Sequence, residues 1–139
     1  MKLITGAGGF IGSNLVAALE AVGDEIAVCD WLDAPEKMKN LENRRITERI
    51  SPDNLLKFMR DREGEIETVF HMGAISSTTE TNVALITEIN VALPIQIFTW
   101  CRDHKVPFIY ASSAATYGDG ALGFNDDDTV LALQQLQTL

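Results

Sequence analysis

The feature that most constrains the fold is a glycine-rich segment near the N-terminus, TGAGGFIG at residues 5–12. A short apolar run, residues 2–5, precedes it, and apolar residues recur after it at helical spacing until Gly23. A second apolar run, Ile26 to Asp30, is charged only at its last residue, as expected for a strand covered on both faces. These segments predict a strand, a tight turn, a helix and a second strand.

The three glycines at positions 6, 9 and 12 have distinct expected roles in such a turn. Gly6 allows the tight turn, Gly9 lets the backbone approach a pyrophosphate, and Gly12 lets the helix pack closely on the strand. The N-terminus of the helix also offers unpaired N–H groups and the positive end of its dipole to phosphates. We therefore predict a dinucleotide-binding turn; the alternative is a flexible turn that binds no ligand.

Asp30 ends the second predicted strand 18 residues after Gly12, where a carboxylate can accept hydrogen bonds from the adenosine ribose. A carboxylate at this place favours NAD, because it repels the 2′-phosphate of NADP. Lys37, seven residues further on, could compensate that repulsion, or it could be an ordinary surface lysine. Asp30 favours NAD and Lys37 favours NADP, so the choice between the two cofactors stays open.

Apolar runs and helical patterns alternate along the rest of the chain. They predict an α/β fold, a doubly wound parallel sheet of the Rossmann type with helices on both faces. Residues 1–139 form one NAD(P)-binding domain in this interpretation, incomplete at its C-terminus, because residues 126–139 contain no finished element. The expected later elements are a weak strand near 45–50, a helix capped by Ser51 with Pro52 first, a strand at 67–71, a helix at 82–104 disturbed by Pro94, and a strand at 106–112.

Composition excludes several functional classes. The net charge of −9 argues against a nucleic-acid partner, because binding to phosphates relies on an excess of Lys and Arg. Eight of the eleven basic residues nevertheless lie between Lys37 and Arg62, facing either an anionic ligand or solvent. Cys29 and Cys101 belong to no Cys/His cluster, so we expect neither a metal site nor a disulfide. No secretory signal and no apolar run of about 18 residues is visible, so we expect a cytoplasmic protein without a membrane partner.

Three motifs resemble a known family. The segment TGAGGFIG at 5–12 is similar to the opening motif of the extended short-chain dehydrogenase/reductases. Within that family, HMGAISSTTE at 71–80 and YASSAATYG at 110–118 resemble the ADP-glyceromanno-heptose 6-epimerases, and SSTTE is the part that discriminates. The resemblance covers essentially the whole chain, including Lys37 and the pair Asn40-Leu41.

The resemblance implies roles for individual residues. His71 and the serines at 112 and 113 also have plain interpretations, as strand-end residues satisfied by the backbone or by local hydrogen bonds. For His71 we prefer the plain interpretation over proton transfer, whereas the resemblance makes Ser113 the catalytic serine. The implied cofactor-binding residues are Phe10 and Ile11 at the pyrophosphate, Asp30 and Trp31 at the ribose, Lys37 at the 2′-phosphate of NADP, Met72, Gly73, Ala74, Ile75 and Ser76 along the cofactor, with Ser76 also near the substrate, and Asn90 on the helix behind the active site.

The resemblance also implies a reaction on ADP-heptose. An oxidised nicotinamide cofactor, NADP or possibly NAD, takes a hydride from the heptose side-chain carbinol and returns it to the other face. The family's base is a tyrosine in a YxxxK motif, yet Tyr110 and Tyr117 are followed four residues later by Ala114 and Ala121. We therefore expect the 139 residues to bind nucleotide without epimerising, and the full-length protein to be a homo-oligomer. The alternatives are another NAD-dependent nucleotide-sugar epimerase or dehydratase, and a non-catalytic dinucleotide-binding module.

Overall fold

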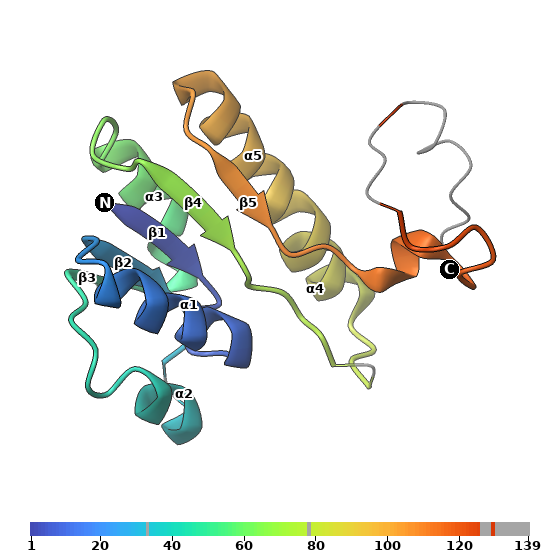
Figure 1. The fold of residues 1–139 in the computed structure, drawn as a ribbon, viewed down its shortest axis with the longest axis horizontal. Helices are drawn as coiled ribbons and strands as arrows, with labels where there is room; N and C mark the ends of the chain where they lie inside the picture. The colour runs from blue at the N-terminus through green and yellow to red at the C-terminus, as the bar shows by residue number, and fades with distance from the viewer. Residues whose placement is uncertain (33, 78, 126–128, 130–139) are drawn as a thin grey trace.

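A five-stranded parallel sheet forms the centre of the computed structural model, which describes residues 1–32, 34–77, 79–125 and 129 (Figure 1). The strand order is β3-β2-β1-β4-β5, and every pairing is parallel. The predicted doubly wound α/β sheet is therefore confirmed. The strands are β1 (Lys2–Thr5), β2 (Ile26–Cys29), β3 (Glu48–Ile50), β4 (Thr68–His71) and β5 (Phe108–Tyr110).

The chain reverses direction across the sheet at β1. It first runs outward through β2 to β3 and then returns to place β4 on the other side of β1. The carboxyl ends of β1 and β4 therefore flank the switch point, where ligands bind in open α/β sheets. The helices are α1 (Phe10–Ala21), α2 (Pro35–Asn40), α3 (Leu55–Asp61), α4 (Val83–Thr87) and α5 (Leu93–His104), with a π-helical turn at Glu88–Ala92 between the last two.

Alternate residues of the inner strands fill two separate cores. Leu3 belongs to the core on the face covered by α3 and α5, and Ile4 to the core on the face covered by α1. Both side chains have no exposed surface. The residues of β2 alternate between the same two cores, which explains why that strand is apolar at every position.

Helices α4 and α5 form one continuous segment with the π-helical turn between them. Pro94 cannot donate a backbone hydrogen bond and its ring clashes with a regular preceding turn. The π-helical turn at Glu88–Ala92, in which Leu93 N–H donates to Glu88 O, is wider than an α-helical turn. It accommodates the proline, so the helical segment continues without a break. The segment Val83–His104 is long and apolar enough to cross a membrane by length and composition, although its Ile97 and Cys101 are buried in the core against the sheet.

Two local predictions were wrong in detail. Ser51 does not cap a helix, because its Oγ accepts a hydrogen bond from Asn54 Nδ2 and no backbone N–H. Pro52 accordingly opens a 3-10 turn, Pro52–Asn54, before α3 begins. The last strand is also shorter than predicted, since pairing with β4 ends at Tyr110. Most of the tail at 126–139 lies outside the described residues.

Candidate functional site

At two of the three glycine positions of the motif, the structure has room for a hydrogen atom but not for a Cβ. Gly6 has a φ of +65°, and a Cβ there would lie 2.6 Å from the backbone nitrogen of Gly73. A Cβ on Gly12 would lie 2.2 Å from the carbonyl oxygen of Gly6. The tight turn predicted at Gly6 is therefore confirmed, whereas the close approach at Gly12 is to Gly6 and Ala7 of the turn and not to the strand β1 itself. Gly9 stands at the N-cap of α1 without a side-chain cap.

The first turn of α1 presents unpaired amides. Gly9 N–H donates to Gly6 O over 3.1 Å, and Ser13 N–H donates to Gly9 O over 3.0 Å. Within the described part of the chain, the amides of Phe10, Ile11 and Gly12 have no such acceptor. The side chains of Phe10 and Ile11 are exposed. Three amides at the positive end of a helix make a site for an anion of the size of a phosphate group.

Asp30 lies directly after β2 and both of its oxygens are engaged. Oδ2 accepts the N–H of Gly8 over 2.8 Å, and Oδ1 pairs with Lys37 Nζ over 2.7 Å. The carboxylate is buried, 8 % exposed, whereas Trp31 beside it is half-exposed. The interpretation of Lys37 as an ordinary surface lysine was wrong, because it neutralises a buried carboxylate. Each Asp30 oxygen keeps a second lone pair for a ribose hydroxyl.

The segment after β4 is fixed to the turn from one side and to the long helix from the other. Gly73 N–H donates to Thr5 Oγ1 over 3.2 Å, beside the glycine turn. Asn90 accepts the N–H of Ile75 over 2.8 Å and donates to its carbonyl over 2.9 Å. The side-chain amide of Asn90 is thus used to hold this segment; a direct contact with the cofactor stays a prediction. Three other residues of this segment were predicted to line the cofactor. Met72 is half-buried, whereas Ala74 and Ser76 are exposed.

His71 is buried at the end of β4 and is not placed for proton transfer. Its Nδ1 lies 2.6 Å from Thr5 Oγ1, and its ring stacks beside those of Phe108 and Tyr110. Burial lowers the pKa of His71 to about 4, so the ring is neutral at pH 7. Its Nε2 has no hydrogen-bond partner among the described residues. His71 is thus a buried strand-end residue, as expected, but the expectation that the backbone satisfies its ring was wrong, because Nδ1 meets a hydroxyl and Nε2 meets no described residue.

Ser113 is exposed three residues beyond β5 and caps a 3-10 turn, Ala114–Tyr117, by accepting the N–H of Ala115 over 3.2 Å. Its hydroxyl hydrogen remains available for donation. His71 and Tyr110 are paired in register, and the segments that follow β4 and β5 leave the same edge of the sheet (Figure 1). Ser76 belongs to the first of these segments and Ser113 to the second. A catalytic role for Ser113 stays a prediction.

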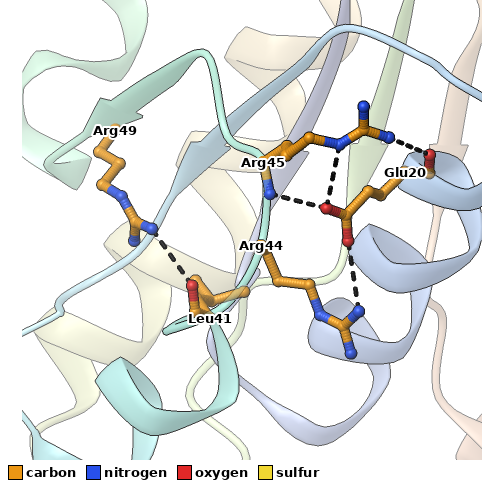
Figure 2. Close-up of polar contacts among 5 residues, drawn as sticks. All are labelled: Glu20, Leu41, Arg44, Arg45 and Arg49. Carbon is orange, nitrogen blue, oxygen red and sulfur yellow. Dashed lines mark hydrogen bonds and ion pairs between the residues drawn. The ribbon is translucent and has the colours of Figure 1, made fainter.

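The basic residues between 37 and 62 do not gather at the glycine turn. Figure 2 shows Glu20, near the C-terminal end of α1, accepting hydrogen bonds from Arg44 Nη1 over 3.2 Å and from the backbone N–H of Arg45 over 2.8 Å. These bonds, that of the Arg45 backbone first, lower the pKa of Glu20. Arg49 Nη2 donates to Leu41 O over 3.2 Å, just after α2. The cluster fastens loops to helices and leaves Lys37 as the cation beside the turn.

Three polar contributions were missed by the sequence analysis. They are the Thr5 hydroxyl, the Gly8 amide and the Asn40 side chain, whose Nδ2 donates to Gly8 O over 2.9 Å. Gly8 lies between the glycines at 6, 9 and 12, whose spacing defines the motif, so the motif gives no signal for it. Among the residues that the structure describes, no three His, Cys, Asp or Glu side chains gather as metal ligands.

Comparison with known proteins settles the family. Residues 2–135 match the model of the NAD dependent epimerase/dehydratase family. The chain belongs to that family.

Relatives and solved structures within the epimerase/dehydratase family are similar over most of this chain. ADP-L-glycero-D-manno-heptose-6-epimerase of Nitratidesulfovibrio vulgaris (strain Hildenborough) is 42 % identical over 134 residues, which are 94 % of this chain and 42 % of that protein. The enzyme of the same name from Fusobacterium nucleatum is 38 % identical, over 100 % of this chain and 43 % of that protein. The chain thus spans less than half the length of these curated relatives.

Among solved structures, the Helicobacter pylori ADP-L-glycero-D-manno-heptose-6-epimerase superposes with a TM-score of 0.70 at 29 % identity, covering 93 % of this chain and 42 % of that one. UDP-glucuronic acid 4-epimerase from Bacillus cereus, in complex with NAD, superposes with a TM-score of 0.66 at 28 % identity, covering 86 % and 42 %. The shared fold therefore extends to family members named for different sugars.

Proposed function

We propose that the complete gene product is an ADP-heptose 6-epimerase, and that these 139 residues form its NADP-binding part. The observation that carries the proposal is the row of three amides at the start of α1, Phe10 to Gly12, which have no acceptor among the described residues and follow the turn at Gly6 at the switch point of the sheet. The two relatives named ADP-L-glycero-D-manno-heptose-6-epimerase, similar over almost the whole chain, support the choice of substrate.

The residues present fit a dinucleotide. The amides of Phe10 to Gly12 would bind the diphosphate, Asp30 the adenosine ribose, and the segment 72–76 the nicotinamide half. When bound, the nicotinamide ring supplies the hydride chemistry that an unactivated carbinol requires. Ser113 would donate its hydroxyl hydrogen to the reacting oxygen of the sugar as negative charge develops there.

We propose NADP as the preferred cofactor, with NAD as the second choice. A lone carboxylate after β2 would repel the 2′-phosphate, whereas Lys37 holds Asp30 in a neutral pair only 2.7 Å across. The Lys37 side chain is 35 % exposed, and its ammonium group has three N–H donors, so it can bind the carboxylate and a phosphate at the same time.

A turnover assay with matched substrates tests the proposal. The complete gene product, supplied with NADP, should invert the side-chain carbinol of ADP-heptose and leave UDP-glucose and UDP-glucuronic acid unchanged. Turnover of a UDP-sugar alone would instead favour a 4-epimerase, a candidate supported by the shared fold with the Bacillus cereus enzyme. Binding of nucleotide without any turnover would favour a non-catalytic binding module.

We also propose that the complete gene product is a cytoplasmic homo-oligomer without a nucleic-acid partner. Exposed apolar side chains on the helical segment 83–104, among them Val91, Ile95 and Phe98, support self-association. The net charge of −9 supports the absence of nucleic acid. Both cysteines are free thiols, in keeping with a reducing compartment. Light scattering after gel filtration tests the oligomer, and a monomer would contradict it.

A further inference from the structure

Both backbone polar groups of Gly8 are held by side chains from outside the glycine turn. Its N–H donates to Asp30 Oδ2 over 2.8 Å, and its carbonyl accepts from Asn40 Nδ2 over 2.9 Å. Asn40 is the last residue of α2, which also carries Lys37 to Asp30. The short helix α2 therefore reaches Gly8 directly through Asn40 and indirectly through Lys37, which pairs with the Asp30 carboxylate that accepts the Gly8 N–H.

The orientation of the Gly8–Gly9 peptide decides which groups face an anion. The carbonyl end of that peptide is bound by Asn40, and its N–H end donates to Gly6 O over 3.1 Å. With both ends engaged, Phe10 carries the first unpaired amide at the start of α1. A rotation of the peptide would turn an acceptor oxygen toward the place of the diphosphate, where phosphate oxygens are repelled.

Tertiary contacts, and not the helix itself, fix the position of Asn40. Helix α2 has only six residues, too few to be stable alone. The next residue, Leu41, has no exposed surface and belongs to the core beneath α1. Arg49 of β3 donates to the Leu41 carbonyl over 3.2 Å (Figure 2). On the other side, a Cβ on Gly8 would lie 2.9 Å from Lys37 Cβ, so α2 is already in close contact with the turn.

We propose that Asn40 is a positioning residue for the cofactor diphosphate: it fixes the Gly8–Gly9 peptide so that donors alone face the anion. This inference rests on the proposed function, because it assumes that the start of α1 binds a diphosphate. It assigns to α2 a second task besides the pairing of Lys37 with Asp30.

Two ligands that differ only in the diphosphate separate positioning from general damage. In the complete gene product, Asn40→Leu keeps a similar shape and removes the donor, and Asn40→Ala removes it without any risk of overpacking. Binding of ADP, measured by calorimetry, should weaken about tenfold in both variants, the value of about one hydrogen bond. Binding of adenosine should change less than about twofold, because adenosine does not reach the turn.

Asn43→Leu is the matched control. Asn43 is exposed in the same segment and has no hydrogen bond to the turn among the described residues, so its variant should bind both ligands as the wild type does. Asn40 variants that bind ADP normally, or that lose ADP and adenosine equally, would overturn the positioning role. A wild-type protein that does not bind ADP at all would overturn the proposed function itself.

Discussion

The two halves of the sheet differ in how far their polar groups are hydrogen-bonded and their apolar side chains are buried. Around β1 and β2, Ile4 and Ile26 have no exposed surface, and the glycine turn is bound by Asp30 and Asn40. At the β5 edge, Ile109 and Tyr110 are 46 % and 47 % exposed, and Ser113 is exposed beyond them. The region around β1 and β2, proposed for the nucleotide, is thus already packed and hydrogen-bonded in this chain. The β5 edge, proposed for the sugar, is in place but remains exposed.

The largest expected effect tests how tightly the region around β1 and β2 is packed. Gly12→Ala places a Cβ 2.2 Å from the Gly6 carbonyl, so the turn or α1 must move. We expect a loss of about 3 kcal/mol in the free energy of unfolding, near the upper end for overpacking, and loss of detectable NADP binding. Gly23→Ala is the control, since its Cβ meets nothing within 4 Å and only its φ of +85° is strained. If Gly12→Ala binds NADP as the wild type does, the close approach is not required.

The same substitution in both regions tests the comparison directly. Ile26→Ala, in β2, should lower the free energy of unfolding of the 139-residue chain by about 3 kcal/mol through a buried cavity. Ile109→Ala, in β5, should cost less than about 1 kcal/mol, because nearly half of that side chain is already exposed. Urea unfolding of the two variants gives both values. Equal losses would contradict the difference between the two halves.

Acid should destabilise the protein through His71, which joins the two halves. Burial lowers its pKa from 6.5 to about 4 in the folded state, so between these values the unfolded chain binds more protons. Stability attributable to the neutral ring is present above pH 6.5 and falls toward pH 4, by about 2 kcal/mol at pH 5. Urea unfolding of the complete gene product at pH 7.5 and 5 should show this loss.

A substitution of the buried ring tests whether it causes that loss. His71→Gln should reduce the difference between the two pH values, because the glutamine side chain does not titrate. An unchanged pH dependence in His71→Gln would show that other groups cause the acid loss.

The smallest expected effect concerns the choice of cofactor in the region around β1 and β2. Lys37→Met leaves the Asp30 carboxylate without its cation and should weaken NADP about tenfold more than NAD, the value of one charged contact near the surface. Lys39→Met is the control, because Lys39 lies on the same helix and its side chain forms no ion pair within the described part of the chain. Competitive binding of the two cofactors measures the ratio. A ratio unchanged by Lys37→Met would remove the case for NADP.

Several residues show which features of the structure local sequence patterns can predict and which they cannot. The glycines at 6 and 12 and the acidic end of β2 were predictable because spacing along the chain sets turn, helix and strand directly. Ser51 was predicted to be a helix cap and is not, because Pro52–Asn54 forms a 3-10 turn in which its hydroxyl meets Asn54 instead. Such a turn and a capped helix have the same sequence signature.

The sequence by itself determined a parallel α/β sheet with a glycine turn at the start of its first helix, since these depend on neighbours within a few residues. Only the tertiary structure decided the partners of the polar groups around that turn. Thr5 meets His71 from 66 residues away, Gly8 meets Asn40 from 32, and Ile75 meets Asn90 from 15. Such pairs depend on strand order and on the paths of loops, so no local pattern of residues encodes them.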